Sequence, residues 1–438
     1  MKMNIKSGSL PALLLMLGLA CSGLPAHAAR ADPELVRVTR LPDGALQPQA
    51  ATDSAGVVHL IYFKGEPMHG DVFYVQSADG GATFTKPLRV NSQPGSVIAT
   101  GTVRGAHMAV GKAGRVHVAW MGSQKAEPKA AGKSSPMQYT RLNDAGDAFE
   151  PQRNVIQRRP GLDGGGSVAA DGEGNVYVAW HAPTEAKDES ARHPHDPKKG
   201  HVPPHAKGGH GEAEHHAQDA KKGHAGGGHA EADRHVWVAS SSDDGRTFAP
   251  EVAGNPKPTG VCACCGMRVF ADARGRVYVL YRGATDMVNR DMHLLVSNDK
   301  AATFEDAKAH PWKIGKCVMS TAAFSGGPDG GVVAAWETRE QVYFTKYPGD
   351  DSDAPAESPA PGAGQNRKHP AVAVGRDGRF VLAWTEGTGW NKGGTVRWQA
   401  FDKDGTPLEG GAGQHEGLPA WSVPAVVAVP DGSFRILF

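Results

Sequence analysis

Four cysteines in the second half of the chain are its sharpest chemical signal. Three of them lie in one tetrapeptide, Cys262-Ala263-Cys264-Cys265, and the fourth is Cys317. Thiols at this spacing can pair as disulfides in an oxidising compartment, and as thiolates they can bind a soft ion such as copper(I) or zinc. Met267 and Met319 would be further sulfur ligands in a metal site. A redox-active thiol is a third alternative.

The spacing of the cysteines limits these alternatives without deciding between them. In an extended segment, Cys262 and Cys264 share one face and Cys265 points away. A disulfide between the adjacent cysteines is disfavoured, because its small ring strains the backbone. The C-x-C-C run is also not a standard zinc spacing. The sequence therefore predicts either disulfides that join neighbouring repeats or a thiolate metal site.

A second group of metal-binding side chains lies in a low-complexity segment. Residues 184–234 are dominated by Ala, Gly, Lys, Glu and Pro and show no apolar pattern, so we expect a disordered, histidine-rich insertion. Imidazoles on such a tether would bind zinc, nickel or copper weakly, without a preformed geometry. The alternative is a loop expansion without metal function, which costs little chain entropy. The candidate ligands are His193, His195, His201, His205, His210, His215, His216, His224, His229 and His235.

A repeated strand pattern must position these residues. A glycine-containing turn followed by an alternating apolar run occurs seven times, at 52–63, 110–120, 170–180, 271–281, 327–336, 374–384 and 429–438. Successive turn glycines lie 47 to 60 residues apart, except for 101 residues across the insertion. Such runs are typical of buried strands. We expect an all-β protein, a single β-propeller of about seven, alternatively six, four-stranded blades.

The ends of the chain are expected to close this ring. The last repeat stops at Phe438 after two strands, whereas Glu34–Pro42 resembles the outer strands of other repeats. Pairing of the N- and C-terminal strands would complete the last blade and hide an edge that favours aggregation. The propeller would then span 33–438. In this alignment, Cys262–Cys265 precede the inner strand of the fourth repeat and Cys317 that of the fifth, so their sulfurs should meet at one mouth of the ring.

The N-terminal residues are typical of a secretory signal peptide. Basic residues precede an apolar run, Leu10–Ala20, and a small-residue cleavage site, Ala26–Ala28. We therefore expect 1–28 to be removed and the protein to be periplasmic or secreted, with a lipid anchor on Cys21 as the alternative. No other segment is apolar enough to span a bilayer. The formal net charge of +1 gives no indication of a nucleic-acid partner.

A second motif recurs in three repeats. It reads SADGGATF at Ser77–Phe84, SSDDGRTF at Ser241–Phe248 and SNDKAATF at Ser297–Phe304. The aspartate can accept backbone N–H bonds, the glycine can take positive φ, and the aromatic ring can bury the turn against its own blade. We therefore expect a self-supporting hairpin turn in each of these repeats.

This S-x-D-x-G-x-T-F pattern resembles the Asp box, or BNR repeat, of sialidase-superfamily β-propellers. The resemblance extends over nearly all of the expected mature chain. It implies a structural role, away from the ligand-binding mouth, for Ser77, Asp79, Gly81, Phe84, Ser241, Asp243, Gly245, Phe248, Ser297, Asp299 and Phe304.

The resemblance also implies what sialidase catalysis would require. Three arginines would hold the substrate carboxylate, a glutamate would activate a tyrosine nucleophile, and an aspartic acid would protonate the leaving group. The F/Y-R-I-P motif of the family is missing, because the corresponding stretch reads Leu46–Ala50, LQPQA. We therefore expect a member without sialidase activity. The weak catalytic candidates are Arg104, Arg268, Arg367, Glu337 and Tyr343.

Three functions follow from these features. The first, and the one that we predict, is an exported propeller that acts as a binding platform for a glycan or a protein, with the cysteine cluster at its mouth. The second is a periplasmic protein that binds copper or zinc. The third is a sialidase-type exo-glycoside hydrolase.

Overall fold

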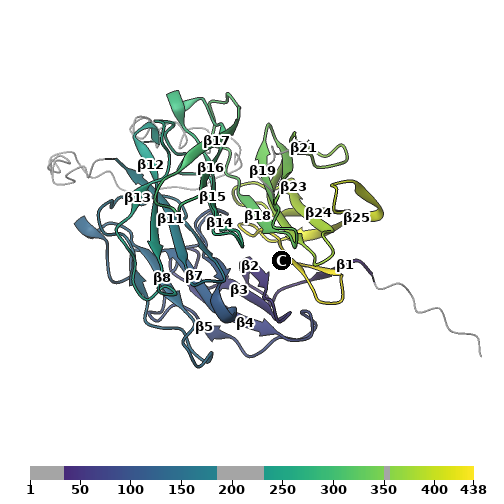
Figure 1. Cartoon of the computed structure of the whole chain (residues 1–438), viewed down its shortest axis with the longest axis horizontal. Helices are drawn as coiled ribbons and strands as arrows, with labels where there is room; N and C mark the ends of the chain where they lie inside the picture. Colours follow the sequence, from purple (N-terminus) through teal and green to yellow (C-terminus); the bar gives the residue numbers. More distant parts are fainter. Residues whose placement is uncertain (1–33, 185–230, 350–355) are drawn as a thin grey trace, which may run out of the picture. The chain divides into compact units, whose positions relative to one another are not determined.

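The repeated turns and apolar runs form small antiparallel sheets. The computed structural model describes residues 34–184, 231–349 and 356–438 (Figure 1). The strands of these ranges form six four-stranded sheets and one sheet of three. In chain order the four-stranded sheets are β2 (Leu46–Thr52), β3 (Val58–Lys64), β4 (Asp71–Ser77) and β5 (Leu88–Arg89); β6 (His107–Val110), β7 (Val116–Met121), β8 (Met137–Arg141) and β9 (Arg153–Asn154); β10 (Ser167–Ala170), β11 (Val176–Pro183), β12 (Arg234–Ser241) and β13 (Val252–Ala253); β14 (Arg268–Ala271), β15 (Val277–Arg282), β16 (Met292–Ser297) and β17 (Glu305–His310); β18 (Ala322–Gly326), β19 (Val332–Thr338), β20 (Gln341–Tyr347) and β21 (Ser358–Pro359); β22 (Arg367–Val374), β23 (Phe380–Glu386), β24 (Gly394–Phe401) and β25 (Pro407–Leu418).

These sheets are the blades of a seven-bladed β-propeller, numbered here 1 to 7 in the order just given. The first strand of each blade packs against the first strand of the next, and β26 (Ala425–Ala428) of blade 7 returns to β2 of blade 1. The predicted all-β propeller is therefore confirmed, with seven blades rather than six. The repeated apolar run forms the second strand of each blade. It is not the innermost strand, as we had expected, because another strand precedes it in every blade.

The two ends of the propeller close the ring, as predicted. Blade 7 combines β26 and β27 (Phe434–Leu437) with β1 (Val36–Thr39) from the beginning of the described residues. β1 runs parallel to β27, with Val36 opposite Phe434. Just beyond the strand, the Leu41 N–H donates to the Phe438 carbonyl at 2.9 Å. Figure 1 shows the C-terminus beside β1.

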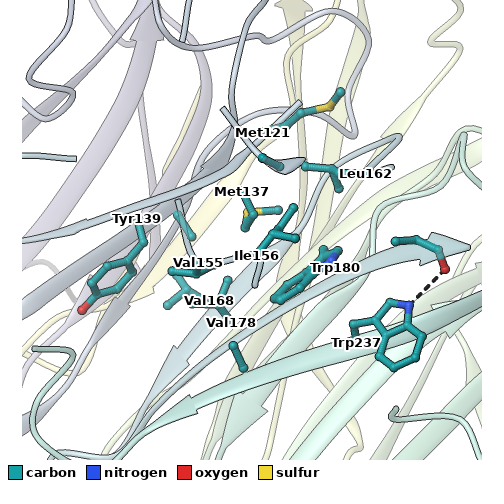
Figure 2. Close-up of a cluster of buried hydrophobic side chains, with 14 of the residues drawn as sticks. Met121, Met137, Tyr139, Val155, Ile156, Leu162, Val168, Val178, Trp180 and Trp237 are labelled. Carbon is teal, nitrogen blue, oxygen red and sulfur yellow. Dashed lines mark hydrogen bonds between the residues drawn. The ribbon is translucent and has the colours of Figure 1, made fainter. Parts of the chain in front are cut away.

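The apolar core is divided into layers between neighbouring blades. Each of seven buried clusters combines side chains of two successive blades, including blades 7 and 1. Figure 2 shows the layer between blades 2 and 3, where Met137 packs near Trp180 and the Trp237 indole donates to the Ala182 carbonyl at 3.0 Å. Every blade is therefore stabilised through its neighbours, so blades are not independent folding units.

Two predicted segments lie wholly or mostly outside the described residues. The expected signal peptide, 1–28, is one. The histidine-rich insertion is the other, and only its ends are described, at the point where Pro183 of β11 pairs with Arg234 of β12. Within the described ranges, no helix is long and apolar enough to cross a membrane.

Candidate functional site

Two loops at one end of the ring carry the four cysteines. Cys262–Cys265 precede β14 and Cys317 precedes β18, the innermost strands of blades 4 and 5, which lie side by side (Figure 1). The Gly266 N–H donates to the Ser320 carbonyl at 2.9 Å and ties the loops together. A hydrogen bond between Cys264 and Cys317 places the fourth thiol beside Cys264. We call this end of the ring the mouth.

The three sulfurs of the tetrapeptide converge. Cys262 Sγ lies 3.2 Å from Cys264 Sγ and 3.7 Å from Cys265 Sγ, and all three atoms lie within 4.8 Å of one another. Cys262, Cys264 and Cys265 are free thiols. Two sulfurs bonded at about 2.3 Å to one tetrahedral ion would be about 3.8 Å apart. The spacing therefore resembles the sulfur edges of a metal site.

The expected orientation of Cys265 is wrong. Its side chain does not point away from the other two, because the tetrapeptide forms a tight turn instead of an extended segment. The Cys265 N–H approaches the Cys262 carbonyl at 3.4 Å, which folds the third sulfur back onto the first. Met267 lies in the apolar layer between blades 3 and 4 and packs there with other core residues.

Positive charge and apolar packing surround the thiols. Trp312 and Val318 pack against Cys262 and Cys265. Burial raises the pKa of the Cys265 thiol, but hydrogen bonds from the other two thiols and the nearby Arg282 guanidinium lower this pKa well below its usual value. The hydrogen bond with Cys262, by contrast, raises the pKa of Cys264. The cluster thus favours one thiolate, held by two thiol donors and an arginine.

Arg282 is itself held in a buried network beneath the cluster. Its guanidinium donates to the Arg290 carbonyl at 2.7 Å and lies 5.4 Å from the centre of the Trp312 ring. The Glu337 carboxylate is 3.6 Å away, and both members of this ion pair are almost completely buried. Burial raises the pKa of Glu337 to about 7, against the opposing effect of Arg282.

The mouth contains an open pocket beside the cysteines, of about 450 Å³. Among the three cysteines of the triplet, Cys264 lines this pocket and is the least buried. Met319, His369 and Trp421 line it as well, and all three have left-handed backbones, with φ of 50°, 51° and 62°. The remaining lining residues are Gly101, Thr102, Val103, Arg104, Lys368, Thr388, Gly389 and Trp390.

The left-handed residues reflect the repeat. Gln47, with φ of 52°, holds the matching position in blade 1. Its N–H donates to Ser422 of the preceding blade at 3.2 Å, just as the His369 N–H donates to Ser320 at 3.3 Å. Each left-handed residue thus lies near the start of an innermost strand, and Met319, His369 and Trp421 line the pocket. The left-handed conformation strains the backbone of a non-glycine residue, and such strained residues are often found at functional sites.

Two buried histidines accompany the cluster. Burial lowers the pKa of both His181 and His369 to about 3, so both imidazoles are neutral. Arg234 donates to His181 Nδ1 at 3.3 Å. Among the described residues, none forms a hydrogen bond with His369 Nδ1. His369 therefore presents a neutral nitrogen, with no protein partner, beside the thiols.

The weak sialidase candidates do not form one site. The three arginines line three different pockets. Arg104 pairs with Asp163 at 3.4 Å, Arg367 with Glu386 at 3.0 Å, and Arg268 contacts His107 and Gln49 in the central channel.

The glutamate and tyrosine candidates are placed no better for catalysis. Glu337 pairs with Arg282 in the buried network, whereas the Tyr343 ring packs edge-on against His310 at 4.7 Å. Each of the five therefore has a partner that explains it structurally.

The recurring Ser-Asp motif forms the same turn in blades 1, 3 and 4. In blade 3, Asp243 accepts from the Thr247 backbone at 2.8 Å, the Thr247 hydroxyl at 2.6 Å and the Ser241 hydroxyl at 2.7 Å. Phe248 packs edge-on against Tyr139 at 4.8 Å, so the aromatic ring joins the preceding blade and is not confined to its own. The turns follow the third strands, at the end of the ring opposite the mouth.

One of the ten candidate histidines lies within the described residues, immediately after the insertion. His235 lies in β12 and stacks on Trp237 at 6.1 Å. The other nine histidines of the predicted set lie outside the described residues.

Sequence reasoning missed the contribution of His369, His181 and the two tryptophans to the mouth. A usable signal was present, because Gln47-Pro48 and His369-Pro370 occupy equivalent positions, as do Met319-Ser320 and Trp421-Ser422. Aligning the repeats on the residues ahead of the innermost strand, instead of on the second strand, would have brought these positions together.

The comparisons with known proteins concern the fold. No family model and no curated protein matches the chain. A protein of unknown function from Dyadobacter fermentans is 15% identical, over 80% of this chain and 93% of the other, with a TM-score of 0.48. A Hadza microbial sialidase is 12% identical over 78% and 63%, with a TM-score of 0.47, and the six-bladed Aleuria aurantia lectin is 8% identical over 87% and 97%, with a TM-score of 0.46. The number of blades in this chain rests on its own sheets.

Proposed function

We propose that this propeller is an exported platform that binds a soft metal ion at its mouth, through the thiolates of Cys262, Cys264 and Cys265. The observation that supports the proposal is the convergence of three free sulfurs within 4.8 Å. Thiolates select copper(I) or zinc among biological metals. Export is part of the same proposal and rests on the signal-like N-terminal residues.

The surroundings of the cluster suit an ion better than they suit neutral thiols. Binding displaces thiol protons, so positive charge nearby favours it by stabilising thiolates. Arg282 supplies that charge from a buried position, and Arg290 lies close enough for the three cysteines to raise its pKa. The apolar packing of Trp312 and Val318 excludes water, which strengthens these interactions.

The competing interpretation is a pair of disulfides, and one experiment separates the two. The exported protein is purified without oxygen, and its metal content and free thiols are measured. We expect about one copper or zinc ion per chain, and four thiols that react once the protein is unfolded and the metal removed.

Serine at all three positions of the triplet should abolish metal binding. Met267→Leu is the matched control, because its sulfur lies in the core and its loss should leave metal content unchanged. Two disulfides with no bound metal would contradict the proposal.

A second candidate function is binding of a glycan or protein ligand at the same mouth. It is favoured by Trp390, which is 44% exposed and packs edge-on against Trp421 at 5.9 Å. Such aromatic surfaces commonly contact ligands. Candidate oligosaccharides and peptides that bind at the mouth should change the fluorescence of these tryptophans, which would report binding.

A further inference from the structure

We infer that the metal ion is copper(I), and that it enters and leaves the thiolate cluster through the pocket, by way of Met319 and His369. The inference rests on the proposed metal function and specifies its ion and its path. We call Cys264, Met319 and His369 the port.

The first step in the argument is the position of Cys264. It belongs to the sulfur cluster and also lines the pocket, whereas Cys262 and Cys265 are buried behind it. An ion that leaves the cluster toward solvent must therefore pass Cys264. The pocket in front of this thiol carries two further donors, the Met319 thioether and the His369 imidazole.

The chemistry of these donors identifies the ion. A thioether is a soft ligand that copper(I) accepts, while zinc sites are built from thiolate, imidazole and carboxylate. An imidazole binds copper readily when it is neutral and its nitrogen is not already bonded. His369 is buried, and among the described residues nothing accepts from or donates to its Nδ1. Where a buried polar atom lacks a hydrogen bond, an absent water or ion is one physical explanation.

The backbone conformations of Met319 and His369 also support their assignment to the port. Met319 and His369 come from neighbouring blades and both hold strained, left-handed conformations at the mouth. Glycine would relieve the strain, as it does at Gly101 and Gly164, which have φ of 70° and 81°. Both positions instead carry side chains that can bind copper(I).

The transfer is an exchange of ligands with no change of oxidation state. Copper(I) enters as copper(I), binds the Met319 sulfur and the His369 nitrogen, and passes to Cys264 as its thiol loses a proton to solvent. Cys262 then also loses its proton to solvent, and bonds to the Cys262 and Cys265 thiolates form as the bonds to Met319 and His369 break. Stepwise exchange between soft ligands avoids releasing the free ion.

The test measures copper release from the intact protein. The exported protein is loaded without oxygen with one equivalent of copper(I), and a chromogenic copper(I) chelator in excess then removes the ion. We expect Met319→Leu and His369→Asn each to slow release by about tenfold or more, a size typical of groups that assist a metal site. Stoichiometry should stay at one ion per chain. Leucine matches methionine in size, and asparagine tolerates a left-handed backbone.

Two controls make the result specific. Met68→Leu removes an exposed thioether outside the pocket and should release copper at the wild-type rate. In the second control, wild-type protein and the Met319→Leu variant are loaded with zinc instead of copper. Both should release zinc at the same rate. A third measurement does not depend on variants: silver(I), a closed-shell analogue of copper(I), should shift the methyl NMR signal of Met319 and not that of Met68.

The outcomes separate the inference from the proposed function. Wild-type release rates in both port variants, with copper still bound at one ion per chain, would overturn the port and leave the metal site standing. If Met319→Leu slows the release of zinc as strongly as the release of copper, the assignment to copper(I) is overturned. A wild-type protein that binds no metal at all would overturn both.

Discussion

The thiol of Cys265 shows how opposing local effects decide the chemistry of one side chain. Burial alone would keep this thiol protonated, because a buried thiolate loses its hydration. Two neighbouring thiols that donate to it, together with Arg282, reverse the balance and lower its pKa. A metal ion acts in the same direction as Arg282, since it stabilises the thiolate. The apo-cluster is thus already arranged to be negative where an ion would bind.

The carboxyl group of Glu337 should make stability depend on pH. Burial raises the pKa of Glu337 from 4.5 to about 7. The folded protein therefore binds this proton more tightly than the unfolded chain, and the contribution to stability is full below pH 4.5 and is lost as pH rises through about 7. At about 1.4 kcal/mol per pKa unit, the loss is about 3.5 kcal/mol at most.

We therefore expect Glu337→Gln to flatten the decline in unfolding free energy between pH 5 and pH 8, measured by urea unfolding of reduced, metal-free protein. Glu340→Gln is the control, because Glu340 is exposed and pairs with Lys316 at the surface. An unchanged slope in Glu337→Gln would show that this carboxyl group titrates normally in the folded protein.

At the scale of elements, the Ser-Asp turns connect blades at the end opposite the mouth. Hydrogen bonds from Thr247 and Ser241 lower the pKa of Asp243 to about 2, although burial opposes them. Because the folded pKa is depressed, the stability that this carboxylate contributes is present above pH 4 and is lost as pH falls through about 2. Phe248 of the same turn packs against Tyr139 in the neighbouring blade, so the turn also stabilises the contact between the two blades.

Asp243→Ala should lower the unfolding free energy by about 1–2 kcal/mol, since it removes three hydrogen bonds from a half-buried turn. Copper content and release should not change, because the turn is remote from the mouth. Asp144→Ala serves as the matched control: its carboxylate pairs with Arg115 at the surface, and we expect a change below about 1 kcal/mol. Equal losses in the two variants, measured by urea unfolding, would argue against a special role for the motif.

Much of the fold, but only part of the candidate site, could be predicted from the sequence. Strand period and turn glycines repeat locally, so seven blades and the closing strand were visible in the residues themselves. Cys262 and Cys317 could be placed because they precede equivalent strands. The orientation of Cys265 depends on the tight turn at Cys262–Cys265. This tetrapeptide contains no glycine that would have indicated a turn. His369 approaches the cysteines only because blades 4 to 6 curve around a common axis, which local patterns do not encode.

At the scale of the whole molecule, the mouth exists only if the ring is closed. Pocket residues come from blades 2, 4, 5, 6 and 7 and from the loops between them, so their separation depends on every intervening interface. No covalent bond closes the ring among the described residues. Closure depends on β1, whose Val36 is buried and packs in the layer between blades 6 and 7.

A chain that begins at residue 42 should therefore lose both stability and the mouth. Removing β1 exposes apolar surface worth about 2 kcal/mol for Val36 alone, and it leaves β27 as an open edge. We expect urea unfolding at a lower midpoint, self-association in light scattering, and faster, less selective copper release, because blade 7 carries Trp421 at the pocket. The control begins at residue 34 and retains β1, so it should match the untruncated protein in all three measurements. A monomeric chain from residue 42 with unchanged stability and copper release would mean that six interfaces suffice to hold the mouth, and that β1 covers an edge without closing the ring.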